Sequence, residues 1–280
     1  MSKWQIPSDV NCLEVNGYPI SYQDIGVGPT IVLIHGSITD YRIWAPQVAG
    51  LTSNHRVVAP SLRHYFPEKW DGDGSDFTID QQAADVIALI KHLDLPKVHL
   101  LGWSRGGLVA IEVGRQAPER VKSLILEDGN TSLAGVETEQ TRRATAASAE
   151  RLDNLKANIQ RGEPERGAQE LVDALNGTGA WARLSDDRRQ IMLDNITTAL
   201  ADKRPPVPRE VFAALTMPIL LLTGQNSPVA YSNFYDELRK IRKCGPTVVI
   251  PKAAHLMHLE SPDAFNAAVA AFVSANEQGD

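Results

Sequence analysis

The strongest constraint on the fold is a series of short, continuous apolar runs that recur through the chain. Each run has the length of a strand, and they lie at positions 31–34, 57–59, 98–101, 124–126, 219–222 and 248–250. Strands that are apolar on both faces need helices on both sides, which is typical of a parallel sheet. The sequence therefore predicts a buried parallel sheet as the centre of the molecule.

Helix and turn signals occupy the segments between these runs. Thr78 to Gln81 form a capping box, and apolar positions then follow helical spacing up to position 93. Ser261 and Pro262 indicate the N-cap and first residue of a last helix. The alternating segment 13–22, centred on Asn-Gly, predicts an antiparallel hairpin. Because strands and helices alternate, the expected class is α/β.

One interval of about ninety residues, between positions 127 and 218, has no strand run. Helical stretches are expected there at 139–159, 165–175 and 186–200. Ligands bind at the carboxyl ends of the strands in such sheets, so we expect the interval to cover that edge as a lid. The alternative is a helical excursion that only enlarges the core.

Charge and composition exclude several function classes. The 280 residues carry 34 acidic and 28 basic side chains, a formal net charge of −6, which argues against a nucleic-acid partner. The apolar runs are far shorter than the ~20 residues that span a bilayer, and the first ten residues have no signal core, so we expect a cytoplasmic protein with no membrane partner. Cys12 and Cys244 form neither a disulfide framework nor a metal site, and neither a metal nor a cofactor is expected.

The segment 98–110 reads as a strand, then Gly-x-Ser-x-Gly, then an apolar helix, with Ser104 at the centre. This order is typical of a nucleophile elbow, in which a sharp turn lifts a serine hydroxyl above the sheet. Gly102 and Gly106 remove the side chains that would clash in such a turn. The helix that follows directs its N-terminal amides toward developing negative charge. The alternative is a serine in an ordinary glycine-rich turn.

These features together resemble the α/β-hydrolase fold superfamily, in its cap-bearing serine esterase and C–C hydrolase branch. The resemblance rests on His35-Gly36-Ser37 after the first apolar run, the elbow at Ser104, the helical interval, and the segment 254–262. It implies a mostly parallel eight-stranded sheet with helices on both faces. It also implies a core formed by 1–128 and 217–280 and a helical cap formed by 129–216.

The resemblance assigns roles to individual residues. Ser104 is the nucleophile, His255 in the segment 254–262 is the general base, and the amides of Ser37 and Arg105 form the oxyanion hole. His258, three residues after His255, is the competing base, but His255 holds the position immediately after the strand.

The catalytic acid is where the sequence departs from the family pattern. The usual acid position, after the seventh strand, holds Ser227, which cannot stabilise an imidazolium by charge. The alternative position in this fold, after the sixth strand, holds Asp128, and strand alternation directs the neighbouring Glu127 away. We therefore expect Asp128 to be the acid; the alternative is a turn-forming Asp before Gly129.

Substrate contacts are expected from two aromatic residues and from the loop 61–70, where the family usually has an acidic residue and a glycine pair. The candidates are Trp103, Arg63, His64, Tyr65 and Trp181. For the loop residues, the alternative is a solvated loop. His35 is expected to have a purely structural role.

The sequence and the resemblance together predict a metal-free serine hydrolase with a Ser104, His255, Asp128 triad. The expected substrate is a small-molecule carboxylic ester or lactone, cleaved through an acyl-enzyme. Two alternatives stay open: hydrolysis of a carbon–carbon bond in a ring-cleavage diketone, and a non-catalytic ligand-binding member of the fold. A homodimer is also left open.

Overall fold

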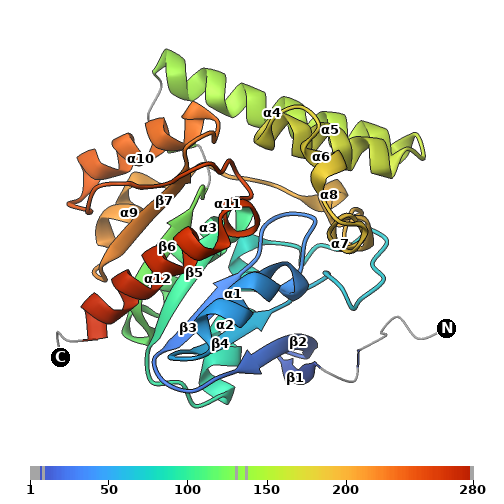
Figure 1. Ribbon diagram of the computed structural model, residues 1–280. Helices are drawn as coiled ribbons and strands as arrows, with labels where there is room; N and C mark the ends of the chain where they lie inside the picture. The colour runs from blue at the N-terminus through green and yellow to red at the C-terminus, as the bar shows by residue number, and fades with distance from the viewer. Residues whose placement is uncertain (1–6, 8–9, 130–131, 136–137, 278–280) are drawn as a thin grey trace.

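The computed structural model describes residues 7, 10–129, 132–135 and 138–277. A single eight-stranded sheet runs through the molecule in the order β1-β2-β4-β3-β5-β6-β7-β8 (Figure 1). Its strands are β1 (Asn11–Val15), β2 (Tyr18–Ile25), β3 (Thr30–Ile34), β4 (Arg56–Pro60), β5 (Val98–Trp103), β6 (Val121–Glu127), β7 (Ile219–Gly224) and β8 (Val248–Ile250). All six apolar runs lie in these strands, which confirms the predicted sheet.

Strand direction follows the two sequence patterns. The strands from β3 to β8 pair in parallel, whereas β2 pairs antiparallel with both β1 and β4. The β1–β2 hairpin turns at Asn16 and Gly17, which have φ angles of 50° and 70°. Positive φ at both central residues is the signature of a type I′ turn, so the predicted hairpin is confirmed.

Helices cover both faces of the sheet. One face packs against α2 (Ile79–His92), α3 (Arg105–Gln116), α9 (Arg209–Ala214) and α10 (Val229–Ile241), and the other against α1 (Ala45–Leu51) and α12 (Pro262–Glu277). Along β3, Val32 and Ile34 belong to one apolar core and Ile31 and Leu33 to the other. This alternation explains why every position of a central strand has to be apolar.

Both predicted helix starts lie at the expected residues, but the side-chain hydrogen bonds at each differ from those expected. The Thr78 hydroxyl accepts a hydrogen bond from the Gln81 amide at 3.1 Å, which confirms Thr78 as the N-cap of α2. The second bond of the predicted capping box is absent, because the Gln81 side chain donates to Asp85 Oδ1 at 2.9 Å and the Thr78 amide donates to the Asp76 carbonyl oxygen. At α12 the first residue is Pro262 as expected, but the Ser261 hydroxyl donates to the Pro251 carbonyl oxygen at 2.8 Å. The Ser261 side chain therefore ties the helix start to the preceding loop.

A helical insert joins β6 to β7 and lies over the carboxyl-terminal edge of the sheet (Figure 1). Besides α9, its helices are α4 (Glu139–Gln160), α5 (Pro164–Asn176), α6 (Ala180–Arg183), α7 (Asp186–Asp194) and α8 (Thr198–Ala201). At its start, the Tyr235 hydroxyl of α10 donates to the Leu126 carbonyl oxygen at 2.8 Å and accepts from the Gly129 amide at 3.0 Å.

The single helix expected at 186–200 is wrong, because the chain breaks between α7 and α8. Asn195, at the break, is buried. Its side-chain nitrogen Nδ2 donates to Asp40 Oδ2 at 2.7 Å, and its side-chain oxygen Oδ1 accepts from the Phe66 main-chain amide at 2.7 Å. These bonds to two core loops hold the break in place, and no helical periodicity encodes them.

The expected division into a core and a cap at 129–216 agrees with the position of the insert and remains a prediction as a statement about domains. Parts of both predicted ranges, at 1–6, 8–9, 130–131, 136–137 and 278–280, lie outside the described residues. No helix in the described part of the chain is long and apolar enough to cross a membrane.

Candidate active site

Ser104 lies on the sharp turn between β5 and α3. Its backbone angles are φ 53° and ψ −120°, a conformation that a residue with a side chain rarely adopts. Only 8% of its surface is exposed, and it lines a cavity under the helical insert. The elbow predicted from Gly-x-Ser-x-Gly is thus present in the structure.

The glycines beside Ser104 are required by close backbone contacts. A Cβ atom on Gly102 would lie 2.4 Å from the Gly106 carbonyl oxygen, and one on Gly106 would lie 2.4 Å from the His35 carbonyl oxygen. A Cβ on Gly107 would lie 2.8 Å from Gly129 Cα. Helix α3 therefore packs directly against β3 and against the turn that follows β6.

Asp128 and His255 form a buried pair at the carboxyl-terminal edge of the sheet. Asp128 Oδ2 lies 3.2 Å from His255 Nδ1, and the two side chains are 0% and 3% exposed. The Thr223 hydroxyl donates to Asp128 Oδ1 at 2.7 Å, and the Ser227 hydroxyl donates to Oδ2 at 2.6 Å. Three donors thus orient one carboxylate. Asp128 contacts only Nδ1 of His255, and the other ring nitrogen, Nε2, is not bonded to it.

Glu127 and His258 form a second buried pair beside the first. Glu127 Oε1 lies 2.7 Å from His258 Nδ1, and both side chains are fully buried. Burial raises the pKa of Glu127 well above its usual value and lowers the pKa of His258 to about 3. Burial thus disfavours the charged form of both side chains. Glu127 and His258 do not compete with Asp128 and His255, because each carboxylate faces a different ring.

Aromatic and polar neighbours fix the position of the His255 ring. The Tyr231 ring stacks on it with a centroid distance of 4.9 Å and an interplanar angle of 13°. The Trp103 indole N–H donates to the His255 carbonyl oxygen at 3.0 Å. From the insert, the Asn176 side-chain oxygen accepts from the Leu256 amide at 2.8 Å. The loop that carries the candidate base is thus held by both the core and the insert.

The His35-Gly36-Ser37 turn lies against the elbow. His35 Nδ1 bonds the Gly36 carbonyl oxygen at 2.9 Å, and Nε2 accepts from the Leu62 amide at 3.0 Å. Burial lowers the pKa of His35 to about 3, so the neutral ring holds this turn, as expected of a structural histidine. Ser37 lines the cavity, and Arg105 is the first residue of α3, where amides have no acceptor within the helix.

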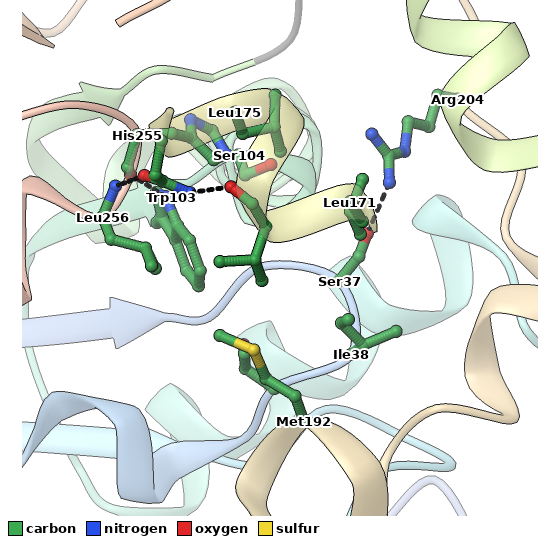
Figure 2. Close-up of a pocket in the computed structure, with 13 residues that line it drawn as sticks. Ser37, Ile38, Trp103, Ser104, Leu171, Leu175, Met192, Arg204, His255 and Leu256 are labelled. Carbon is green, nitrogen blue, oxygen red and sulfur yellow. Dashed lines mark hydrogen bonds between the residues drawn. The ribbon is translucent and has the colours of Figure 1, made fainter. Parts of the chain in front are cut away.

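The cavity beside Ser104 is small and mostly apolar (Figure 2). Its volume is about 30 Å³, far below the roughly 300–1,000 Å³ of typical ligand pockets. Residues of the insert form one side of it: Leu171, Val172, Leu175, Asn176, Met192 and Arg204. Residues of the core form the other: Ser37, Ile38, Thr39, Trp103, Ser104, His255 and Leu256. A substrate larger than a small acyl group therefore requires side chains of the insert to move.

A buried ionic network connects the insert to the elbow. Asp202 Oδ1 accepts from Arg105 Nε at 2.8 Å, and Oδ2 accepts from Arg204 Nε at 3.0 Å and from the Ser37 hydroxyl at 2.9 Å. Burial alone would raise the pKa of Asp202, but the two guanidiniums outweigh it and lower that pKa. Asp202 is therefore ionised at neutral pH.

Of the five predicted substrate contacts, only Trp103 lines this cavity. Arg63 pairs with Asp85 at 2.8 Å and with Asp76 at 3.0 Å, so its guanidinium is already occupied. His64 stacks on the Trp70 ring with a centroid distance of 4.4 Å. The polar loop residues form ion pairs and ring contacts of their own, away from Ser104.

The other two predicted contacts are also buried elsewhere. Tyr65 packs against His35 with a ring-centroid distance of 4.5 Å. Trp181 is 4% exposed in the apolar core that the insert shares with one face of the sheet. Aromatic residues often contact ligands, yet the same residue types also fill cores, as these two do.

Sequence reasoning missed several residues of the site. Thr223, Ser227 and Tyr231 all lie in or after β7, where a search for a carboxylate finds nothing. The role of Ser227 could have been inferred from the sequence, because a hydroxyl at the usual acid position can donate to a carboxylate that follows the neighbouring strand. Asn176 and Arg204 come from the insert, where no motif marks them. Within the described residues, no group of three or more His, Cys, Asp or Glu side chains could hold a metal ion.

Comparisons with known proteins identify the family of the chain. The family model described as "Alpha/beta hydrolase family" matches residues 31–268. The chain is 28% identical over 262 residues to 3-oxoadipate enol-lactonase 1 of Acinetobacter baylyi, covering 88% of this chain and 89% of that protein. It is 25% identical over 263 residues to the serine hydrolase BPHL of Mus musculus, covering 92% and 84%.

A solved structure supports the fold. The thermophilic esterase from Thermogutta terrifontis superposes with a TM-score of 0.75 at 23% identity, over 95% of this chain and 97% of that one. At this level of identity, the match establishes a shared architecture.

Proposed function

Because the chain belongs to the alpha/beta hydrolase family, we propose that it is a serine hydrolase that cleaves a small-molecule carboxylic ester or lactone through an acyl-enzyme. The observation that carries the proposal is the buried Asp128–His255 pair, whose histidine lines the same cavity as a serine in a strained elbow. The names of two relatives, an enol-lactonase and a serine hydrolase, favour acyl chemistry at oxygen.

In the acylation step, the Ser104 hydroxyl oxygen attacks the carbonyl carbon and His255 Nε2 takes the hydroxyl proton. Asp128, bonded to Nδ1, orients the ring and stabilises the imidazolium. The C–O bond to the alcohol then breaks, and the leaving oxygen takes the proton from His255. In a lactone the leaving oxygen stays attached through the ring.

In the deacylation step, His255 takes a proton from water, and the hydroxide formed attacks the acyl carbon. The bond to Ser104 oxygen then breaks, and that oxygen recovers the proton. In both steps the carbonyl oxygen becomes negative, and we assign its stabilisation to the main-chain amides of Ser37 and Arg105. The N-terminus of α3 favours the same charge.

Covalent labelling tests the proposal. A fluorophosphonate should modify one serine, and the label should be lost in Ser104→Ala, with hydrolysis of 4-nitrophenyl esters lost in parallel. Ser232→Ala, an exposed hydroxyl on α10, provides the matched control and should label normally. Labelling that persists in Ser104→Ala would refute the assignment.

A further inference from the structure

The cavity beside Ser104 contains one permanently charged side chain. Arg204 lines it together with His255, and the other lining residues are apolar or neutral. About a fifth of the Arg204 side chain, 22%, is exposed. Figure 2 shows its guanidinium approaching Ser37 from the insert. A single cation in an otherwise uncharged cavity favours a ligand group of negative charge.

The charges around Arg204 do not balance. Asp202 bonds both Arg105 and Arg204, so one carboxylate faces two guanidiniums. Lys156 Nζ donates to the main-chain oxygen of Asp202 at 3.1 Å and adds a third cation. Two positive charges therefore remain uncompensated within this network.

Arg151 of α4 lies close to the same place. Within the described residues it has no hydrogen bond and no ion pair, although its side chain is partly buried. Burial lowers the pKa of its guanidinium, and the positive charge of Arg204 acts in the same direction. Tyr231 and Glu150 act in the opposite direction but do not reverse the shift, so Arg151 adds positive charge on the insert side of Arg204.

Arg204 retains donors for a ligand. Its Nε bonds Asp202 and its Nη2 donates to the Ser37 hydroxyl at 3.0 Å, whereas Nη1 has no hydrogen bond within the described part of the chain. A guanidinium pairs with a carboxylate through parallel N–H bonds, which strengthen when water is excluded.

We infer that the cavity takes an acyl compound that carries a free carboxylate, and that Arg204 binds this carboxylate. The inference rests on the proposed function and specifies its substrate class. Because Arg204 contacts Ser37, whose amide is assigned to the oxyanion hole, the carboxylate would lie only a short chain away from the reacting carbonyl.

Two matched boronic acids test the inference without requiring a known substrate. 2-Carboxyethylboronic acid and its carboxamide differ only in the charge of the terminal group. In both, boron accepts an electron pair from Ser104 oxygen while the hydroxyl proton passes to His255. Protection of Ser104 against the fluorophosphonate measures their binding. We expect the acid to protect at about 10- to 100-fold lower concentration than the amide, the range for a hydrogen bond to a charged group.

Variants identify the residue responsible. Arg204→Gln should remove most of the preference for the acid, and Arg204→Lys should keep part of it, since lysine retains the charge without the paired donors. Arg166→Gln removes an exposed charge from α5 and should leave the preference unchanged. The inference is wrong if acid and amide protect equally, if neither protects, or if Arg204→Gln retains the full preference. Failure of the fluorophosphonate to label Ser104 would instead refute the proposed function.

Discussion

The Ser227 hydroxyl donates to Asp128 Oδ2 at 2.6 Å, the same oxygen that lies 3.2 Å from His255 Nδ1. The residue at the usual acid position of the fold thus supports a carboxylate on the neighbouring strand. Positions 128 and 227 therefore both lie next to the oxygen that contacts His255. A carboxylate at either position, with a hydroxyl at the other, can place an oxygen near His255 Nδ1.

The first prediction concerns the charge of Asp128. Asp128→Asn keeps the size of the side chain and removes the charge that stabilises the imidazolium. We expect kcat for a 4-nitrophenyl ester to fall on the order of 10⁴-fold, the loss known for the equivalent change in serine proteases. Thermal unfolding should show that the variant is folded. A folded Asp128→Asn enzyme with nearly full turnover, beside an impaired Glu127→Gln, would assign the acid to the other buried pair.

The second prediction moves the acid. The double variant Asp128→Asn, Ser227→Asp places a carboxylate at the usual family position, next to the atom that now contacts His255. We expect it to recover part of the activity that Asp128→Asn loses. Ser227→Asp alone should be less stable than the wild type, because it buries a second carboxylate against the first. Activity of the double variant at or below that of Asp128→Asn would show that His255 is not reached from position 227.

The third prediction concerns the size of the cavity. Met192→Ala and Leu171→Ala remove side chains that the insert contributes to the cavity, so longer acyl chains should fit. We expect the optimum in kcat/KM across 4-nitrophenyl esters to shift from short toward longer chains. Leu193→Ala, on the same helix as Met192 and not lining the cavity, is the matched control. An unchanged chain-length profile in both cavity variants would mean that the insert does not select the acyl group.

The fourth prediction concerns acid stability. His35 stays neutral in the folded protein down to about pH 3, since its pKa is lowered to about 3, but takes a proton near pH 6.5 when unfolded. The unfolded state therefore binds more protons below pH 6.5, and the stability that His35 contributes, complete above that pH, is lost as the pH falls toward 3. One proton corresponds to about 1.4 kcal/mol per pH unit.

Urea unfolding of the wild type and of His35→Gln between pH 7.5 and 5 measures this effect. Glutamine can accept from the Leu62 amide, which His35 Nε2 now does, but it does not titrate. The free energy of unfolding of the variant should therefore fall less steeply with decreasing pH. Parallel curves would show that His35 does not cause the acid sensitivity.

The fold could be predicted because its main signals are local. A strand buried on both faces requires a continuous apolar run, and the turn at Asn16-Gly17 requires residues that tolerate positive φ. The break at Asn195 could not be predicted, because its cause is a pair of hydrogen bonds to residues more than a hundred positions away.

The candidate site divides in the same way. Ser104 and Asp128 follow strands directly, so their place at the sheet edge is implied by the order of elements. Arg204 reaches the cavity from a proline-rich connection in the insert, where only the folding of the insert over the sheet gives it a position. The polar and aromatic character of the loop 61–70 suggests binding, but in the structure Arg63 pairs with Asp76 and Asp85 and does not line the cavity.

The hydroxyl of Tyr235 bridges the last residues of β6 and the first residue of the insert. Asp128 lies between these two attachment points, directly before the segment that would have to move for a large substrate to enter. Tyr235 thus fixes the chain on both sides of Asp128 to the core, through helix α10. The insert can change its length, sequence or position beyond Gly129 without displacing the carboxylate, so substrate preference can diverge while the charge beside His255 stays in place.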